Sequence, residues 1–221
     1  MLFIQHELQR TAQNLVADNI KNDEHVLIVS SSDQSKELID AFVSAASSTS
    51  AASVSAIIIA CPEDLKDYKH PPSVIASVEK ADLTIVATTL RFPRAYDDLS
   101  EALFKAGKRQ VLINNAPLED FTRGASLADP IKLNRRTHEL AEKISEGKMV
   151  RVKSENGTDL CVKVCRPCIA LTGRAEIDTG FGSFPSGEAM LSPEEFSAEG
   201  IFVADSFGQV VYLSGSGPQL G

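Results

Sequence analysis

Four short apolar runs, each separated from the next by a segment with helical spacing, constrain the fold of this chain most strongly. A continuous apolar run such as 26–29 is typical of a strand buried in a parallel sheet. Strands that alternate with helices at this spacing indicate βαβ units, so we predict an α/β fold with a Rossmann-like parallel sheet layered between helices. The predicted strands lie near 26–30, 53–60, 83–88 and 111–115, and the predicted helices cover 3–21, 35–46, 74–80 and 96–106.

A change of pattern near residue 147 predicts a domain boundary. Asp129 and Pro130 are typical of a helix N-cap and first helical position, and Gly147 of the residue that ends the helix. Beyond it, apolar and polar residues alternate, as in strands. We therefore predict an α/β domain over 1–147 and a β-rich segment over 148–221, the incomplete start of an α+β metal-site domain. The alternating segments are 149–153 and 160–164, and the turn at 155–158 between them predicts a hairpin.

Charge and composition exclude several classes of function. The net charge is −8 and the sequence pI is about 5.1, with no stripe of Lys and Arg, which argues against a nucleic-acid partner. The N-terminal residues lack the basic and apolar regions of a signal peptide, and no run approaches the length of a membrane span. We expect a cytoplasmic protein without a membrane partner.

Three cysteines have the spacing of a radical-SAM iron–sulfur motif: Cys161, Cys165 and Cys168. The first two lie within the alternating run 160–165, however, and a strand would place them on one face, whereas a cluster motif needs a loop. We interpret them as structural cysteines; a thiolate metal site and a redox pair are the alternatives.

Polar residues follow three of the predicted strands. In open α/β sheets, ligands bind beyond the carboxyl ends of strands, so these residues are candidates for a small-molecule site. No glycine-rich dinucleotide fingerprint follows the first strand, and Ser30–Asp33 is better explained as a helix cap with at most a weak anion site. The other candidates are Thr88 and Thr89, Asn114 and Asn115, and the loop arginines Arg91 and Arg94.

An acidic, turn-rich stretch over 184–205 is the richest candidate for a functional site. Its Pro-Ser-Gly turn, residues 185–187, presents Glu188 at the start of a short apolar run. Ser192 and Pro193 then break the run, and a further strand is predicted over 201–204, ending at Asp205, to give a hairpin-like unit. These acids could equally be ordinary solvated turn residues.

The same stretch resembles the signature of the aminopeptidase T family of metallopeptidases. The resemblance is carried by residues 185–188, a proline five residues later, Ser197–Gly200 and the aliphatic run before Asp205. The Gly-Thr-Asp-Leu segment 157–160 is similar too. The related 2,5-dihydroxypyridine 5,6-dioxygenases share the layout. This resemblance implies that Glu188 is a metal ligand, with zinc, manganese, cobalt or iron(II) as the cofactor, and a peptide or small-molecule substrate.

The remaining ligands of such a site are not evident. All four histidines precede Glu188, whereas in the resembling families histidine and aspartate ligands follow it; here they are His6, His25, His70 and His138. We therefore expect a fragment or a shortened relative that is inactive alone, and we assign no catalytic residue. Three functions stay open: a metal-dependent aminopeptidase, an iron(II)-dependent ring-opening dioxygenase, and a non-catalytic binding or assembly module. Self-association is expected from the architecture of the family.

Overall fold

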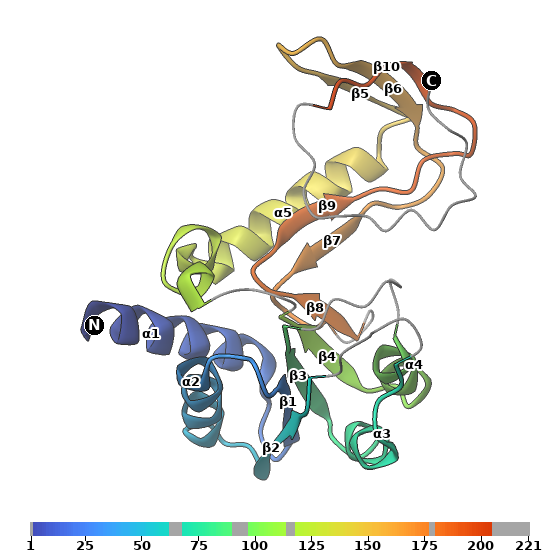
Figure 1. Ribbon diagram of the computed structural model, residues 1–221. Helices are drawn as coiled ribbons and strands as arrows, with labels where there is room; N and C mark the ends of the chain where they lie inside the picture. Colours follow the sequence, from blue (N-terminus) through green and yellow to red (C-terminus); the bar gives the residue numbers. More distant parts are fainter. Residues whose placement is uncertain (1, 62–67, 90–96, 114–117, 177–179, 205–221) are drawn as a thin grey trace. The chain divides into compact units, whose positions relative to one another are not determined.

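The structure, a computed structural model, describes residues 2–61, 68–89, 97–113, 118–176 and 180–204 (Figure 1). Packing divides the chain into two compact units. Unit 1 comprises Met1–Leu140 and Ile169–Met190, and unit 2 comprises Ala141–Cys168 and Leu191–Gly221. In the described part of the chain, no helix combines the length and the apolar character that crossing a membrane requires.

The main sheet of unit 1 is parallel throughout, which confirms the predicted α/β class. The four predicted strands form it, together with a fifth strand, β8, that was not predicted. β8 is only three residues long and contains Gly182, so it lacks the apolar run of a buried strand. In sheet order the strands are β2 (Ser53–Ile59), β1 (His25–Ser31), β3 (Leu83–Ala87), β4 (Arg109–Leu112) and β8 (Phe181–Ser183).

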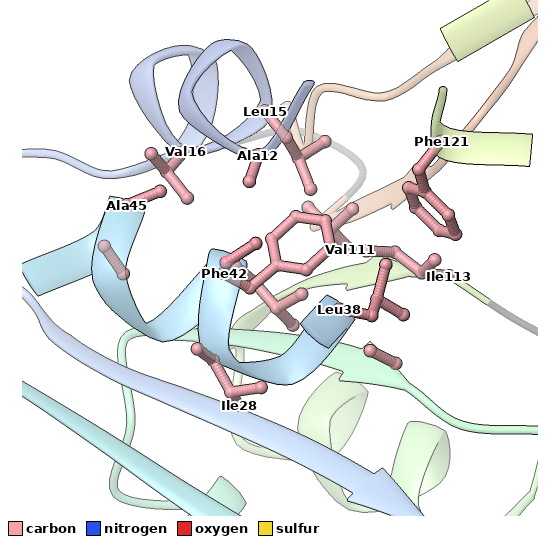
Figure 2. Packing of buried hydrophobic residues seen from close by; sticks show 14 of the residues in the cluster. Ala12, Leu15, Val16, Ile28, Leu38, Phe42, Ala45, Val111, Ile113 and Phe121 are labelled. Carbon is pink, nitrogen blue, oxygen red and sulfur yellow. The ribbon is translucent and has the colours of Figure 1, made fainter. Parts of the chain in front are cut away.

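Helices cover both faces of this sheet, as predicted (Figure 1). On one face, α1 and α2 pack with β1, β3 and β4 around Phe42 (Figure 2). The rings of Phe42 and Phe121 contact each other edge to face, with their centroids 6.0 Å apart. On the other face, α3 and α4 cover a second apolar cluster. The helices are α1 (Leu2–Asn19), α2 (Lys36–Ser47), α3 (Pro72–Val78) and α4 (Asp98–Lys105).

The starts of two helices test the predicted caps. The side chain of Ser35 caps α2 by accepting a hydrogen bond from the backbone N–H of Leu38 at 3.3 Å. The predicted cap, Ser30–Asp33, lies earlier because β1 extends to Ser31. Asp129 does act as predicted, since its carboxylate accepts from Lys132 N at 3.1 Å. It precedes α5 (Pro130–Ser145), which follows the 3₁₀ turns η1 (Leu118–Phe121) and η2 (Gly124–Leu127).

Two small antiparallel sheets contain the other strands. In unit 1, β7 (Ile169–Thr172) pairs with β9 (Gly187–Met190). In unit 2, β5 (Met149–Lys153) and β6 (Asp159–Lys163) form the predicted hairpin, and β10 (Glu199–Ile201) pairs with β6.

The predicted hairpin-like unit of residues 188–204 is therefore wrong. β9 and β10 belong to different sheets, because β9 pairs with β7 and β10 pairs with β6. The second strand also begins earlier than predicted, at Glu199, and ends at Ile201.

The compact units also differ from the division predicted at residue 147. The segment Ile169–Met190 packs with unit 1 because β8 pairs with β4 of the parallel sheet. The segment from Ala141 to Ser145, the last part of α5, is grouped with unit 2.

Candidate functional site

The Phe184–Glu188 segment comprises the connection from β8 to β9 and the first two residues of β9, and it positions the predicted metal ligand. Pro185 follows a cis peptide bond, and the buried Ser186 donates a hydrogen bond from Oγ to the carbonyl of Leu171 at 3.3 Å. At Gly187 a Cβ would lie 2.6 Å from Cδ1 of Leu133, so the missing side chain leaves room for α5. The segment therefore packs against β7 and α5 where the chain enters β9.

Glu188 is the second residue of β9 and is paired in register with Leu171 of β7. It therefore lies in a strand just after the Pro-Ser-Gly turn. Its side chain is exposed. A carboxylate held by a strand on an open surface can serve as an oxygen ligand for a hard divalent cation.

The described residues do not by themselves fit a complete metal site. Among them, no three His, Cys, Asp or Glu side chains converge so that they could hold an ion. The histidine rings have local partners on separate elements. Nδ1 of His6 lies 3.5 Å from Oε1 of Glu7, and Nδ1 of His25 lies 2.8 Å from Oγ of Ser53. Nδ1 of His70 lies 2.7 Å from Oδ1 of Asp98, and Nδ1 of His138 lies 2.9 Å from the carbonyl oxygen of Asn134.

The cysteines of the suspected cluster motif are free thiols in three different settings. Cys161 lies within β6 and is half-buried, Cys165 is exposed, and Cys168 is buried. β6 ends at Lys163, so Cys165 lies beyond the strand, and its Sγ donates to the carbonyl of Ser192 at 3.7 Å. The absence of an iron–sulfur cluster stays a prediction.

The carboxyl ends of β1 and β3 bring together two of the three predicted polar groups. Thr89 Oγ1 lies 3.0 Å from Ser31 Oγ and donates to both carboxylate oxygens of Asp33 at 2.6 Å. The hydrogen bond from Thr89 lowers the pKa of Asp33 below its usual value of 3.8. The network fastens two loops where adjacent strands connect to helices on opposite faces. The other candidates there, Asn114, Asn115, Arg91 and Arg94, lie outside the described residues, as does Asp205.

A pocket within unit 1 adjoins the Phe184–Ser186 turn. It lies between α1, the corner from η2 into α5, and the chain that follows β7 and β8. Thr172 orders one side of it, because its Oγ1 accepts hydrogen bonds from Asn134 Nδ2 and from the backbone N–H of Arg174, both at 3.3 Å. Its lining residues include Leu15, Asp18, Leu133, Asn134, Arg174 and Phe184.

Two charged residues at this pocket, Asp18 and Arg174, were not predicted as site residues. Asp18 is half-buried, and burial raises its pKa above the usual 3.8. The positive charge of Arg174 acts to lower this pKa, and the negative charge of Glu176 acts to raise it. The sequence carries no signal for this pair, because Asp18 looks like an ordinary polar position of an amphipathic helix.

Comparison with known proteins places this architecture among two groups of enzymes. The sequence profile of a family described as 2,5-dihydroxypyridine 5,6-dioxygenase (NicX) matches residues 7–212. The fold is similar to the 2,5-dihydroxypyridine dioxygenase of Pseudomonas putida KT2440, with a TM-score of 0.66 and 21% identity over 89% of this chain and 58% of that one. It is also similar to AmpT from Thermus thermophilus, with a TM-score of 0.58 and 13% identity over 88% of this chain and 63% of that one. No curated protein matches the sequence.

Both solved relatives are longer than the matched part. This chain spans less than two thirds of the length of either one. At these identities the likeness of the structures demonstrates the fold. The resemblance to both groups that the sequence suggested is confirmed.

Proposed function

This chain belongs to the 2,5-dihydroxypyridine 5,6-dioxygenase family, and from that premise we propose that it acts in metal-dependent catalysis with Glu188 as one metal ligand. The observation that carries the proposal is the extent of the family match, which spans both compact units and includes the whole Phe184–Glu188 segment. Zinc, manganese, cobalt and iron(II) are the candidate metals.

The local structure supports Glu188 in this role. Its backbone is fixed by pairing with β7, and its side chain is exposed, so the carboxylate needs no rearrangement of the fold to bind an ion. Among the described residues, no three His, Cys, Asp or Glu side chains converge on one point, so the role we assign to Glu188 is limited to anchoring the ion.

Two reactions have comparable support. The family match and the Pseudomonas structure favour oxygen-dependent ring opening of a dihydroxylated pyridine. The Pro-Ser-Gly-Glu segment at 185–188 and the likeness to AmpT favour hydrolysis of N-terminal peptide bonds. A substrate partner is therefore either a small aromatic molecule or a peptide, and a non-catalytic binding module is the outcome if neither reaction occurs.

Metal titration tests the role of Glu188. We expect the chain to bind Mn²⁺ weakly, with a Kd of roughly 1 mM, because one carboxylate offers few ligand atoms. Glu188→Gln should abolish measurable binding. Glu195→Gln, which removes the same charge from another exposed residue, is the matched control and should leave it unchanged. Calorimetry of the three proteins decides the matter, and tight binding that is indifferent to Glu188→Gln would overturn the assignment.

Turnover assays then distinguish the reactions. The protein is incubated in air with iron(II) and 2,5-dihydroxypyridine, and separately with Zn²⁺, Co²⁺ or Mn²⁺ and an aminoacyl p-nitroanilide. No three potential ligands converge among the described residues, so we expect residues 1–221 alone to show no measurable turnover of either substrate. Consumption of one substrate that requires both the metal and Glu188 would identify the reaction, and turnover that persists in Glu188→Gln would overturn the role of Glu188 in it.

A further inference from the structure

The pocket beside α1 has an apolar floor. Leu15 of α1, Leu133 of α5 and Phe184 after β8 line it. Gly173 helps to form the floor, because a Cβ at this position would lie 2.8 Å from Cδ2 of Phe184 and 3.5 Å from Cδ1 of Leu15. The enclosed space is small, with room for roughly two or three groups of the size of a water or a methyl. A short branched side chain fits such a floor, and a large ring does not.

The rim of the same pocket carries opposite charges. Asp18 comes from α1 and Arg174 from the residues after β7, and their charges act on each other, since Arg174 opposes the rise in the pKa of Asp18. The carboxylate of Asp18 makes no hydrogen bond or ion pair at salt-bridge distance with another residue in the described part of the chain. A half-buried carboxylate in a pocket without such a partner is a feature of ligand sites.

Arg174 also retains capacity for a ligand. Its Nε lies 3.5 Å from Oε1 of Glu176, and both side chains are substantially exposed, 52% and 36% respectively. Exposed pairs of this kind contribute little, so the other donors of the guanidinium remain open to a second carboxylate. Asn134, held in place by Thr172, adds an amide to the rim.

We propose that this pocket binds a small apolar α-amino acid as its zwitterion, with the ammonium group at Asp18, the carboxylate at Arg174 and the side chain on the apolar floor. A simple amine would leave Arg174 unused, and a simple carboxylic acid would leave Asp18 unused. A phosphorylated ligand would meet the negative charge of Asp18. Only a ligand that carries both charges close to a short apolar group matches all three parts of the pocket.

Binding of L-valine to the full chain tests the proposal. The probes are L-valine, L-valinamide, which lacks the carboxylate, and 3-methylbutanoate, which lacks the ammonium group. We expect valine to bind with a Kd of about 1 mM, and each analogue to bind at least about tenfold more weakly, because each loses one charged contact. Chemical-shift changes at Leu15, Asp18 and Arg174 in NMR spectra locate the site. Equal affinities for the three probes, or no shifts at these residues with valine, would overturn the proposal.

Substitutions at the rim provide the second test. Asp18→Asn and Arg174→Gln should each weaken valine binding about tenfold or more. Asp40→Asn is the charge-matched control, because Asp40 lies on α2 with a side chain 62% exposed, outside the pocket. It should leave valine binding unchanged. Valine binding that survives Asp18→Asn would contradict the assignment of the ammonium position.

The pH dependence adds a readout that a purely structural role of Asp18 would not produce. Burial raises the pKa of Asp18, and the charged groups that act on it are Arg174 and Glu176. Valine affinity should therefore fall as the pH drops through the raised pKa of this carboxyl, because the neutral acid no longer attracts the ammonium group. Asp18→Asn should remove that dependence. Glu188 does not line the pocket, so valine binding and the metal titration succeed or fail independently.

Discussion

The parallel sheet of unit 1 and the three-stranded sheet of unit 2 differ in burial. All five residues of β3 are buried, whereas four of the five residues of β5 are exposed. Helices cover both faces of the first sheet and form two apolar clusters with it. The stability of the described fold should therefore depend mainly on unit 1, where burial of apolar side chains supplies the free energy of folding.

A pair of salt bridges shows the same difference in electrostatics. Arg109 of β4 contacts both carboxylate oxygens of Glu24 at 2.5 and 2.6 Å, and these side chains are 10% and 15% exposed. Arg151 of β5 contacts both carboxylate oxygens of Asp159 of β6 at 2.7 Å, but these side chains are 59% and 43% exposed. The two pairs differ in geometry, because Arg109 uses Nη2 for both oxygens whereas Arg151 uses Nε and Nη2. They also differ in burial, which we expect to decide how much each pair stabilises the protein.

The largest expected effect comes from the core of unit 1. Phe42→Ala should lower the free energy of unfolding by about 3–5 kcal/mol, because it removes a fully buried ring that packs on Phe121 and leaves a cavity. Phe202→Ala is the matched change in unit 2, where the side chain is 71% exposed, and should cost less than about 0.5 kcal/mol. Urea unfolding measures both, and equal effects would break the comparison between the two regions.

An intermediate effect is expected from the buried salt bridge. Glu24→Gln should destabilise the protein by about 2 kcal/mol, because it leaves the guanidinium of Arg109 with a weaker neutral acceptor. The hydrogen bond from Arg109 to the carbonyl of Asn19, 2.9 Å long, should persist and keep the fold intact. A loss no larger than that of an exposed pair would mean that solvent reaches this site.

The smallest effect should come from Asp159→Asn in unit 2. Hydrogen bonds from Arg151 lower the pKa of Asp159 from 3.8 to about 2. A lowered pKa stabilises the folded state above pH 3.8, and this contribution is lost as the pH falls from there through about 2. Because the pair is exposed, the substitution should cost little at pH 7, and this cost should shrink as the pH falls through about 2. Stability curves of wild type and variant against pH check this, and a gap that widens in acid would contradict it.

Much of the parallel sheet could be predicted because each strand signals itself locally. Val26–Val29 is apolar throughout and Leu83–Ala87 is apolar except for Thr84, and both prove to be buried on two faces. The hairpin of β5 and β6 could likewise be predicted, from its turn at 155–158. β8 could not be found in this way, since Phe181–Ser183 has no periodicity and becomes a strand only through pairing with β4.

The candidate site was less predictable than the fold. The Pro-Ser-Gly turn placed Glu188 at the start of a strand, as the structure has it, but nothing local showed that its neighbour would be Leu171 of β7. Asp18 and Arg174 lie far apart in the sequence and line the same pocket only because α1 and the end of β7 pack in the same unit.

The sequence by itself determined the α/β class, the positions of the buried strands, the Asp129 cap and the 149–164 hairpin. These features depend on residues close in the chain, whose spacing decides which face is buried. The tertiary structure alone decided that β8 joins the parallel sheet, that β9 and β10 pair with different strands, and that a charged pocket forms beside Phe184. Such pairings depend on which sheet edges and helix faces are free to pair when the chain folds. A short stretch of sequence does not show which of them a strand will pair with.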